Sequence, residues 1–323
     1  MSGRVLVTGG AGFIGSHLVE ALASRGERVR ILDCFDPYYD PALKRRTAAR
    51  LCERGGAVEL HEADLRDPAA VGRAVDGVDA VVHLAARPGV RASIDDPRTT
   101  LDINLTGTLH LLEAMRRRGP RALVFASSSS VYGGDAPLPF REDAPSARPL
   151  SPYAASKRAG ELLCASYVEL FGLSAIGLRF FTVYGPRGRP DMSVGRFVRA
   201  ALEGERVPLH GDGSVERDFT YVDDIVRGLL AALDRVRGGE AGWEVSNLGG
   251  GRIASMRELI ALIEEHTGQR LLVDRHPAAA GDAPRTQADL TRARALLGFE
   301  SRVPLAEGIA RTVAWMRAEL AGA

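Results

Sequence analysis

The sequence predicts an α/β protein with a doubly wound parallel sheet and a smaller C-terminal α/β lobe. Short β-rich runs alternate with segments of helical periodicity through the first 180 residues, which is typical of βαβ units. Runs such as Val5-Leu6-Val7 and Leu123-Val124-Phe125 are apolar at consecutive positions. Such runs indicate parallel strands that helices cover on both faces.

The elements follow this pattern in order along the chain. We predict strands at 4–8, 28–33, 57–62, 79–85, 122–128 and 174–180, with helices around 99–118 and 153–170. After residue 180 the chain becomes rich in Pro, Gly and Arg, and we predict helices at 194–203, 221–235, 255–267 and 305–320, with strands at 207–210 and 243–248. We therefore divide the chain into a domain of residues 1–180, which also receives 215–248, and a smaller lobe of residues 181–323.

Composition and charge argue against several classes of protein. The formal net charge is +1, which gives no overall field to recruit nucleic acid or an anionic membrane. No uninterrupted apolar run approaches the roughly 18 residues of a membrane-spanning helix. Cys34, Cys52 and Cys164 form no Cys-x-x-Cys pair, which argues against a disulfide framework and a zinc site. We expect a cytoplasmic protein without a metal.

A glycine-rich turn joins the first predicted strand to the first predicted helix. Gly9, Gly12 and Gly15 have the spacing that permits a tight turn, close approach to a pyrophosphate and close helix packing. Asp33 ends the second strand, where a carboxylate accepts hydrogen bonds from an adenosine ribose, and no arginine follows it to bind a 2′-phosphate. Asp64 either flanks the adenine or caps a loop. The pattern predicts a Rossmann-type domain that binds NAD.

A tyrosine and a lysine share one face of a predicted helix. Tyr153 and Lys157 are four residues apart, and a nearby ammonium or a cationic nicotinamide stabilises a phenolate whose unperturbed pKa is about 10. Lys157 is one of two lysines among 42 lysine and arginine residues, and we expect the other, Lys44, on a surface loop. Four serines at 127–130 follow an apolar strand, at the edge where such sheets bind ligands.

Several motifs together resemble one enzyme family. The glycine turn, HLAA at 83–86, SSSSVYG at 127–133, Y-x-x-x-K at 153–157 and RDFTYVDDI at 217–225 resemble the extended short-chain dehydrogenase/reductases, specifically the nucleotide-sugar epimerases. The resemblance covers nearly the whole chain. Within that group, DPYYDPALK at 36–44, PGVRASIDDP at 88–97 and GRPDM at 188–192 are similar to the UDP-glucuronic acid 4-epimerases.

The resemblance implies roles for individual residues. Tyr153 would be the catalytic base, Lys157 would bind the nicotinamide ribose and lower the pKa of the tyrosine, and Ser128 would share the proton path. Residues placed around NAD, besides Tyr153 and Lys157, are Gly9, Gly12, Phe13, Ile14, Gly15, Asp33, Asp64, Leu65, Leu84, Ala85, Ala86 and Asn104. The helices around 99–118 and 153–170 would form a homodimer.

A second set of residues is expected to bind the UDP-sugar. By the same resemblance, Arg217 and Asp282 would face the diphosphate and ribose. The stretch before Asp282 lacks an arginine that some relatives carry, and Arg285 is an alternative. The hydroxyls of Ser128, Ser129, Ser130 and Thr182 and the guanidinium of Arg189 are suited to hold the sugar and its carboxylate.

The implied reaction is the NAD-dependent 4-epimerisation of UDP-glucuronic acid to UDP-galacturonic acid through a 4-keto sugar. Ser129 and Ser130 stand where 4,6-dehydratases carry an Asp-Glu pair, and Ser130 stands where UDP-glucuronate decarboxylases carry a glutamate. Dehydration is therefore disfavoured, and decarboxylation is a weaker alternative. UDP-glucose 4-epimerases share the tyrosine, the lysine and the first serine, so that activity stays open. A non-catalytic NAD-binding sensor, an alternative of a different class, would not need the Tyr153–Lys157 pair.

Overall fold

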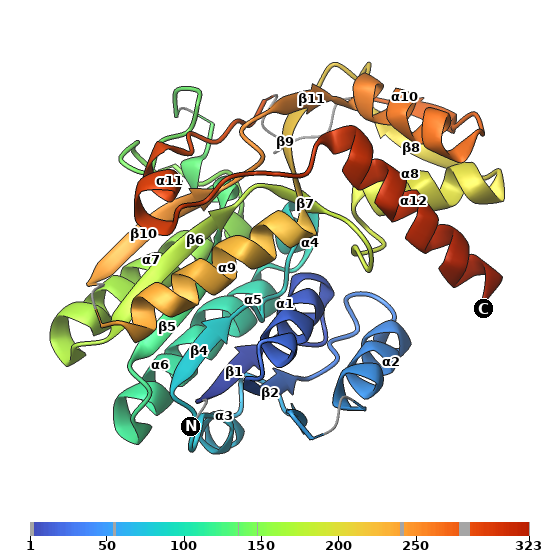
Figure 1. The fold of residues 1–323 in the computed structure, drawn as a ribbon. Helices are drawn as coiled ribbons and strands as arrows, with labels where there is room; N and C mark the ends of the chain where they lie inside the picture. The colour runs from blue at the N-terminus through green and yellow to red at the C-terminus, as the bar shows by residue number, and fades with distance from the viewer. Residues whose placement is uncertain are drawn as a thin grey trace.

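The computed structural model describes residues 3–53, 56–134, 136–146, 148–239, 242–277 and 285–322. Its largest feature is a seven-stranded, wholly parallel sheet in the order β10-β6-β5-β4-β1-β2-β3 (Figure 1). This arrangement confirms the predicted parallel α/β fold. The strands are β1 (Arg4–Thr8), β2 (Arg28–Asp33), β3 (Val58–Glu62), β4 (Ala80–His83), β5 (Ala122–Ser128), β6 (Ser174–Phe180) and β10 (Trp243–Leu248).

Helices cover both faces of this sheet, so alternate residues of one strand belong to different cores. Val5 and Val7 of β1 pack into the core under α1 (Phe13–Ser24) and α9 (Val222–Arg237). Leu6, between them, packs on the other face with α3 (Pro68–Val75), α6 (Gly107–Arg118) and α7 (Pro152–Phe171). Two buried faces explain why the strand is apolar at consecutive positions.

The strand order reverses between β1 and β4, where a doubly wound sheet opens a crevice at its carboxyl edge. The loops after these two strands meet there. Gly9 has φ 69°, and a Cβ built on it would lie 2.8 Å from the backbone nitrogen of Ala85, so this position needs glycine both for its conformation and for its close approach.

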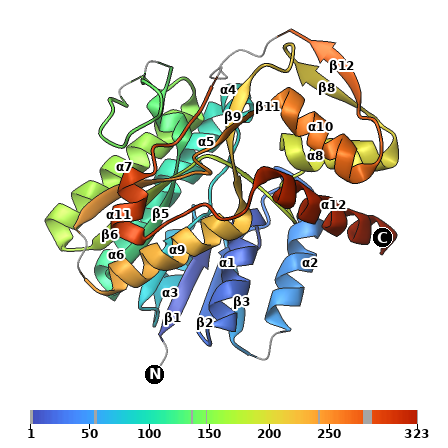
Figure 2. The same cartoon turned by 45° about the horizontal axis from the view of Figure 1, so that its top comes forward.

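The C-terminal part forms a second layer of structure over one end of the large sheet (Figures 1 and 2). β7 (Thr182–Tyr184), β9 (Glu216–Tyr221) and β11 (Ile253–Ser255) form a three-stranded sheet, and β8 (Arg206–His210) pairs with β12 (Leu272–His276). The helices α8 (Ser193–Glu203), α10 (Met256–Thr267) and α12 (Leu305–Ala321) pack against one another. α9 and β10 return to the large sheet, whereas β9 does not. α11 (Thr291–Leu297) also packs against α9 and β10.

Two carboxylates of the motif at 217–225 hold these parts together. Asp218 is wholly buried and accepts backbone hydrogen bonds from Gly250, Gly251 and Ala288. Asp224, also wholly buried, accepts backbone hydrogen bonds from residues 302 and 303. Both carboxylates therefore anchor chain segments, which gives this motif a structural purpose.

A buried ion pair fixes α7 against β5 and β6. Glu161 is wholly buried and accepts two hydrogen bonds from Arg179 of β6, at 2.8 and 2.9 Å, and one from Ser127 of β5 at 2.6 Å. Burial alone would raise the pKa of Glu161, but the hydrogen bonds and charge of Arg179 lower it below its ordinary value. The pair therefore stays ionised inside the protein.

We predict that Arg179→Met strongly destabilises the fold, because it leaves the buried Glu161 carboxylate with only the part-exposed Arg158, at 2.9 Å, as a charge partner. The free energy of unfolding, measured by urea denaturation, should fall by about 3–5 kcal/mol. Arg206→Met removes an exposed arginine paired with Asp274 and serves as the control, with an expected loss below about 1 kcal/mol. Equal losses in the two variants would contradict this account.

Candidate active site

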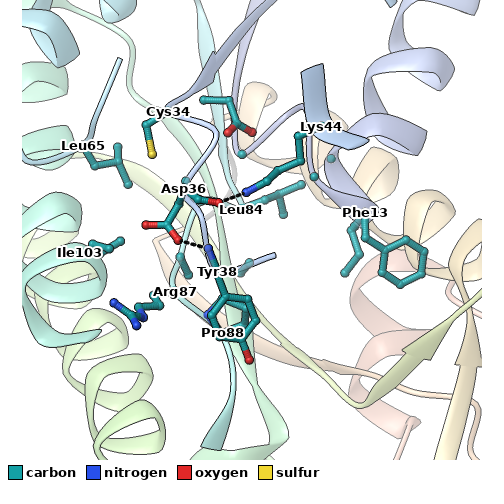
Figure 3. A pocket seen from close by; sticks show the side chains of 18 of the residues that line it. Phe13, Cys34, Asp36, Tyr38, Lys44, Leu65, Leu84, Arg87, Pro88 and Ile103 are labelled. Carbon is teal, nitrogen blue, oxygen red and sulfur yellow. Dashed lines mark hydrogen bonds between the residues drawn. The ribbon is translucent and has the colours of Figure 1, made fainter. Parts of the chain in front are cut away.

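A cavity opens at the carboxyl edge of the large sheet, beside the point where the strand order reverses (Figure 3). Its open space, counted out into the solvent at the mouth, is about 1160 Å³. Predicted residues in its lining are Gly9, Gly12, Phe13, Ile14, Gly15, Asp33, Asp64, Leu65, Leu84, Ala85, Ala86, Tyr153, Lys157 and Arg189. One cavity therefore brings together most residues predicted for the cofactor and two of those predicted for chemistry.

The glycine turn presents backbone donors to this cavity. α1 begins after Gly12, whose lack of a side chain leaves the first N–H groups of the helix without a side-chain cap. A Cβ on Gly15 would lie 2.1 Å from the carbonyl oxygen of Gly9, so the turn can be this tight only with glycine there. The free N–H groups and the helix dipole suit a phosphate.

Asp33 is fixed at the end of β2 by two backbone donors. Its carboxylate oxygens accept hydrogen bonds from Ala11 at 3.1 Å and Phe35 at 2.9 Å. Burial raises the pKa of Asp33, while these bonds and the charge of Lys44 act in the opposite direction. A carboxylate held in this way still has lone pairs for ribose hydroxyls. Together with the glycine turn, it fits the adenosine half of NAD.

Lys44 is a correction to the sequence prediction. It does not lie on a surface loop but in α2 (Pro41–Cys52), where the side chain of Asp40 caps the helix, and it is only 7% exposed. Its Nζ donates a hydrogen bond to the carbonyl of Asp36 and lies 4.4 Å from the ring centre of Tyr39 (Figure 3). The lysine thus lines the cavity close to Asp33.

Tyr153 and Lys157 both line the cavity. Burial raises the pKa of Tyr153, and a hydrogen bond with Ser128 and the positive charge of Arg189 oppose that rise. Lys157 donates a hydrogen bond from Nζ to the carbonyl of Ala126 at 2.8 Å, and burial lowers its pKa to about 8. The hydroxyl of Ser128 and the guanidinium of Arg189 therefore favour the phenolate but only partly offset the effect of burial.

The residues predicted to bind the substrate are spread over several segments. Ser128 ends β5, and its hydroxyl lies within hydrogen-bonding distance, 3.0 Å, of that of Ser130 in the 3-10 turn Ser129–Tyr132. β5 and β6 run in register to the pair Ser128 and Phe180, so Thr182 leaves the same edge of the sheet as the serines. Arg217 lies on β9, outside the cavity lining, and Arg285 pairs with Glu216 at 3.1 Å. Asp282 lies outside the described residues.

Asn104 is buried in a π-helical turn, Asp102–Thr106, and is not among the lining residues. Its carboxamide accepts from the Arg87 backbone nitrogen and donates to the Arg87 carbonyl and to Ser156. Lining residues that the prediction missed include Asp36, Tyr38, Arg87, Pro88 and Ile103. The motifs at 36–44 and 88–97 contain three of these residues, Asp36, Tyr38 and Pro88, and are the signal that could have found them.

The described residues contain neither a candidate metal site nor a membrane-spanning helix. No cluster of three or more His, Cys, Asp or Glu side chains suited to a metal ion occurs among them. Within the same residues, every helix is too short or too polar to cross a membrane.

Residues 5–249 match the model of the NAD dependent epimerase/dehydratase family. The UDP-glucuronate 4-epimerase of Thermodesulfobacterium geofontis is 41% identical over 98% of this chain and 96% of its own. The Bacillus cereus UDP-glucuronic acid 4-epimerase, solved with UDP-glucuronic acid and NAD, has a TM-score of 0.92 and 35% identity over 98% of this chain and 99% of its own.

A further solved relative is MoeE5, which has structures with UDP-glucose and NAD and with UDP-glucuronic acid and NAD. Its UDP-glucose complex has a TM-score of 0.88 and 40% identity over 98% of this chain and 100% of its own. The family match covers more than half of the chain, and these relatives cover nearly all of it. The chain therefore belongs to the NAD dependent epimerase/dehydratase family.

Proposed function

We propose that the protein is an NAD-dependent 4-epimerase that interconverts UDP-glucuronic acid and UDP-galacturonic acid. The observation that carries the proposal is one cavity lined by the glycine turn, Asp33, Tyr153, Lys157 and Arg189. Similarity to UDP-glucuronate 4-epimerases over nearly the whole chain supports the same activity. In this proposal the large sheet carries NAD and the C-terminal layer carries the nucleotide of the substrate.

In the proposed reaction the protein transfers one proton and binds a 4-keto sugar intermediate. Bound NAD supplies the hydride acceptor and later the hydride donor. Tyr153 accepts the proton of the sugar 4-hydroxyl, with Ser128 in the proton path, and returns it after the 4-keto sugar has turned its other face. Lys157 binds the nicotinamide ribose. Since the hydride that is removed is given back, NAD is regenerated in each cycle and has no need to leave.

A uronic acid adds a second requirement, because the 4-keto intermediate is a β-keto acid. Such an acid loses carbon dioxide when the bond to its carboxylate lies parallel to the carbonyl π-system. We propose that the hydroxyls of Ser129, Ser130 and Thr182 and the guanidinium of Arg189 hold the carboxylate out of that orientation. The serines and Thr182 leave neighbouring strands at one edge of the sheet, and Arg189 enters the cavity from the loop that follows.

UDP-glucose is a second candidate substrate. The observation in its favour is that MoeE5, 40% identical to this chain, has been solved with UDP-glucose as well as with UDP-glucuronic acid. The same tyrosine, serine and lysine would serve a neutral sugar, since the reaction takes place at carbon 4.

We also propose a homodimer and a cytoplasmic location. Large apolar side chains are exposed on neighbouring helices: Leu101 of α5 (Pro97–Leu101), Leu109 of α6, and Leu162 and Leu170 of α7. A second copy of the chain would cover such a surface. The three cysteines are free thiols, which fits a reducing compartment.

Epimerisation can be tested by NMR of the purified protein with UDP-glucuronic acid and no added NAD. We expect UDP-galacturonic acid to appear, because NAD should remain bound through purification, and Tyr153→Phe should abolish the reaction. UDP-pentose with carbon dioxide would instead identify a decarboxylase. Turnover of UDP-glucose alone would favour the second candidate substrate.

The pH dependence should report the hydrogen bond between Ser128 and Tyr153. This bond lowers the pKa of Tyr153. Ser128→Ala should therefore raise that pKa and move the rise of kcat/KM with pH toward more alkaline values. Initial rates between about pH 6 and about pH 10 measure this limb. Ser166→Ala, which alters a serine on the exposed part of α7, is the control. An unshifted limb in Ser128→Ala would contradict the assigned role.

Loss of the hydroxyls that hold the carboxylate should release a by-product. The combined variant Ser129→Ala, Ser130→Ala and Thr182→Val should raise the ratio of UDP-pentose to UDP-galacturonic acid about tenfold, because the carboxylate can then align with the ketone. NMR of the product mixture measures the ratio. A ratio equal to that of the unmodified enzyme would show that these hydroxyls do not restrain the carboxylate.

A further inference from the structure

Arg189 enters the cavity already paired with a carboxylate of its own loop. Its Nε and Nη2 donate to the two carboxylate oxygens of Asp191, at 2.9 and 2.7 Å. The hydroxyl of Tyr38, from the loop before α2, donates to the same carboxylate at 3.1 Å. The guanidinium carbon of Arg189 also lies 5.8 Å from the ring centre of Tyr38. Three side chains from two distant segments thus form one cluster at the cavity wall.

The loop that carries Arg189 is fixed to α1 on its other side. His17 of α1 makes a hydrogen bond of 2.9 Å with the carbonyl of Pro186, and Arg187 pairs with Glu20 at 2.6 Å. The position of Arg189 is therefore held both by the helix that follows the glycine turn and by Asp191.

The pairing divides the guanidinium into two edges. Asp191 takes the edge formed by Nε and Nη2, which leaves the edge with Nη1 for an acceptor in the cavity. The side chain of Arg189 is 22% exposed and that of Asp191 is 38% exposed, so water screens the pair incompletely. Burial alone would raise the pKa of Asp191, but its hydrogen bonds with Arg189 and Tyr38 lower it, so the carboxylate stays charged at neutral pH.

The negative charge of Asp191 affects how tightly the cavity binds charged and neutral sugars. A uronate that binds Arg189 meets a guanidinium whose charge Asp191 has already largely neutralised. A neutral sugar, in contrast, leaves Arg189 with its partner in place. Without Asp191, a bound neutral sugar would leave the largely buried guanidinium of Arg189 unpaired, which costs free energy. A uronate would instead bind a guanidinium that it does not share with another carboxylate.

We propose that Asp191, held by Tyr38, is a specificity-determining residue that pre-pairs Arg189 and thereby lets neutral UDP-hexoses share the site with UDP-uronic acids. The inference rests on the proposed function, namely that this cavity binds UDP-sugars. Asp191 acts through Arg189 and is a positioning residue, since its carboxylate contacts the arginine.

The test compares the affinities of the NAD-loaded protein for UDP-glucuronic acid and UDP-glucose by calorimetry, beside kcat/KM for both sugars. In Asp191→Asn the preference for the uronate should rise about tenfold, through tighter uronate binding and weaker glucose binding. Arg189→Gln should lower the preference. Adding Asp191→Asn to Arg189→Gln should then change nothing further, because the residue acts only through the arginine.

The matched control is Asp274→Asn, which breaks an arginine–carboxylate pair with Arg206 on the surface of the C-terminal part. It should leave the preference unchanged. An unaltered or lowered preference in Asp191→Asn, with uronate binding intact in the unmodified protein, would overturn this inference alone. Failure of the unmodified protein to bind either UDP-sugar would overturn the proposed function and the inference together.

Discussion

The cavity depends on a chain of buried hydrogen bonds that passes through His83 at the end of β4. Thr108 donates its single hydroxyl hydrogen to the carbonyl of Asn104, so it must accept the bond from Nε2 of His83. Nδ1 of the same ring then accepts from Thr8 of β1, whose hydroxyl oxygen in turn accepts from the backbone of Ala85. Burial and the charge of Lys157 lower the pKa of His83 to about 3, so the ring stays neutral and the chain keeps its direction. Two strands and a helix are thereby joined where the sheet opens.

The same chain of hydrogen bonds continues into α7 through an irregular turn. The π-helical turn at 102–106 widens the helix locally and lets Asn104 reach two other segments. Its carboxamide pairs with both backbone groups of Arg87, as a neighbouring strand would, and donates to Ser156. Ser156 donates to the carbonyl of Tyr153, in the first turn of α7. The position of the tyrosine is therefore linked, through side chains that never reach the cavity, to the loop that follows β4.

Much of the large sheet could be predicted from the sequence because β1, β4 and β5 carry apolar residues at consecutive positions. Predicted and observed bounds agree at β1, β2, β5, β6 and β10, and differ by one or two residues at β3 and β4. The sequence did not predict β7, β9, β11 and β12. β7 has three residues and is a strand only because residues far along the chain, in β9, pair with it. The residues around β7 in the sequence therefore cannot reveal its pairing with β9. In the same way, Tyr38 and Asp191 are 153 positions apart and meet only in the folded protein.

Lys44 was predicted on a surface loop, but it is buried like Lys157. Both lysines of the chain are buried, line the same cavity and donate a hydrogen bond from Nζ to a backbone carbonyl. A compact ammonium on a flexible stem can reach a carbonyl inside a packed wall, where a planar guanidinium needs a broad, flat set of acceptors. Arg179 and Arg189 have such acceptors in the carboxylates of Glu161 and Asp191. At these four positions the choice between lysine and arginine therefore matches the shape of the acceptor, although the buried Arg30 also donates Nη1 to the carbonyls of Ala74 and Asp76.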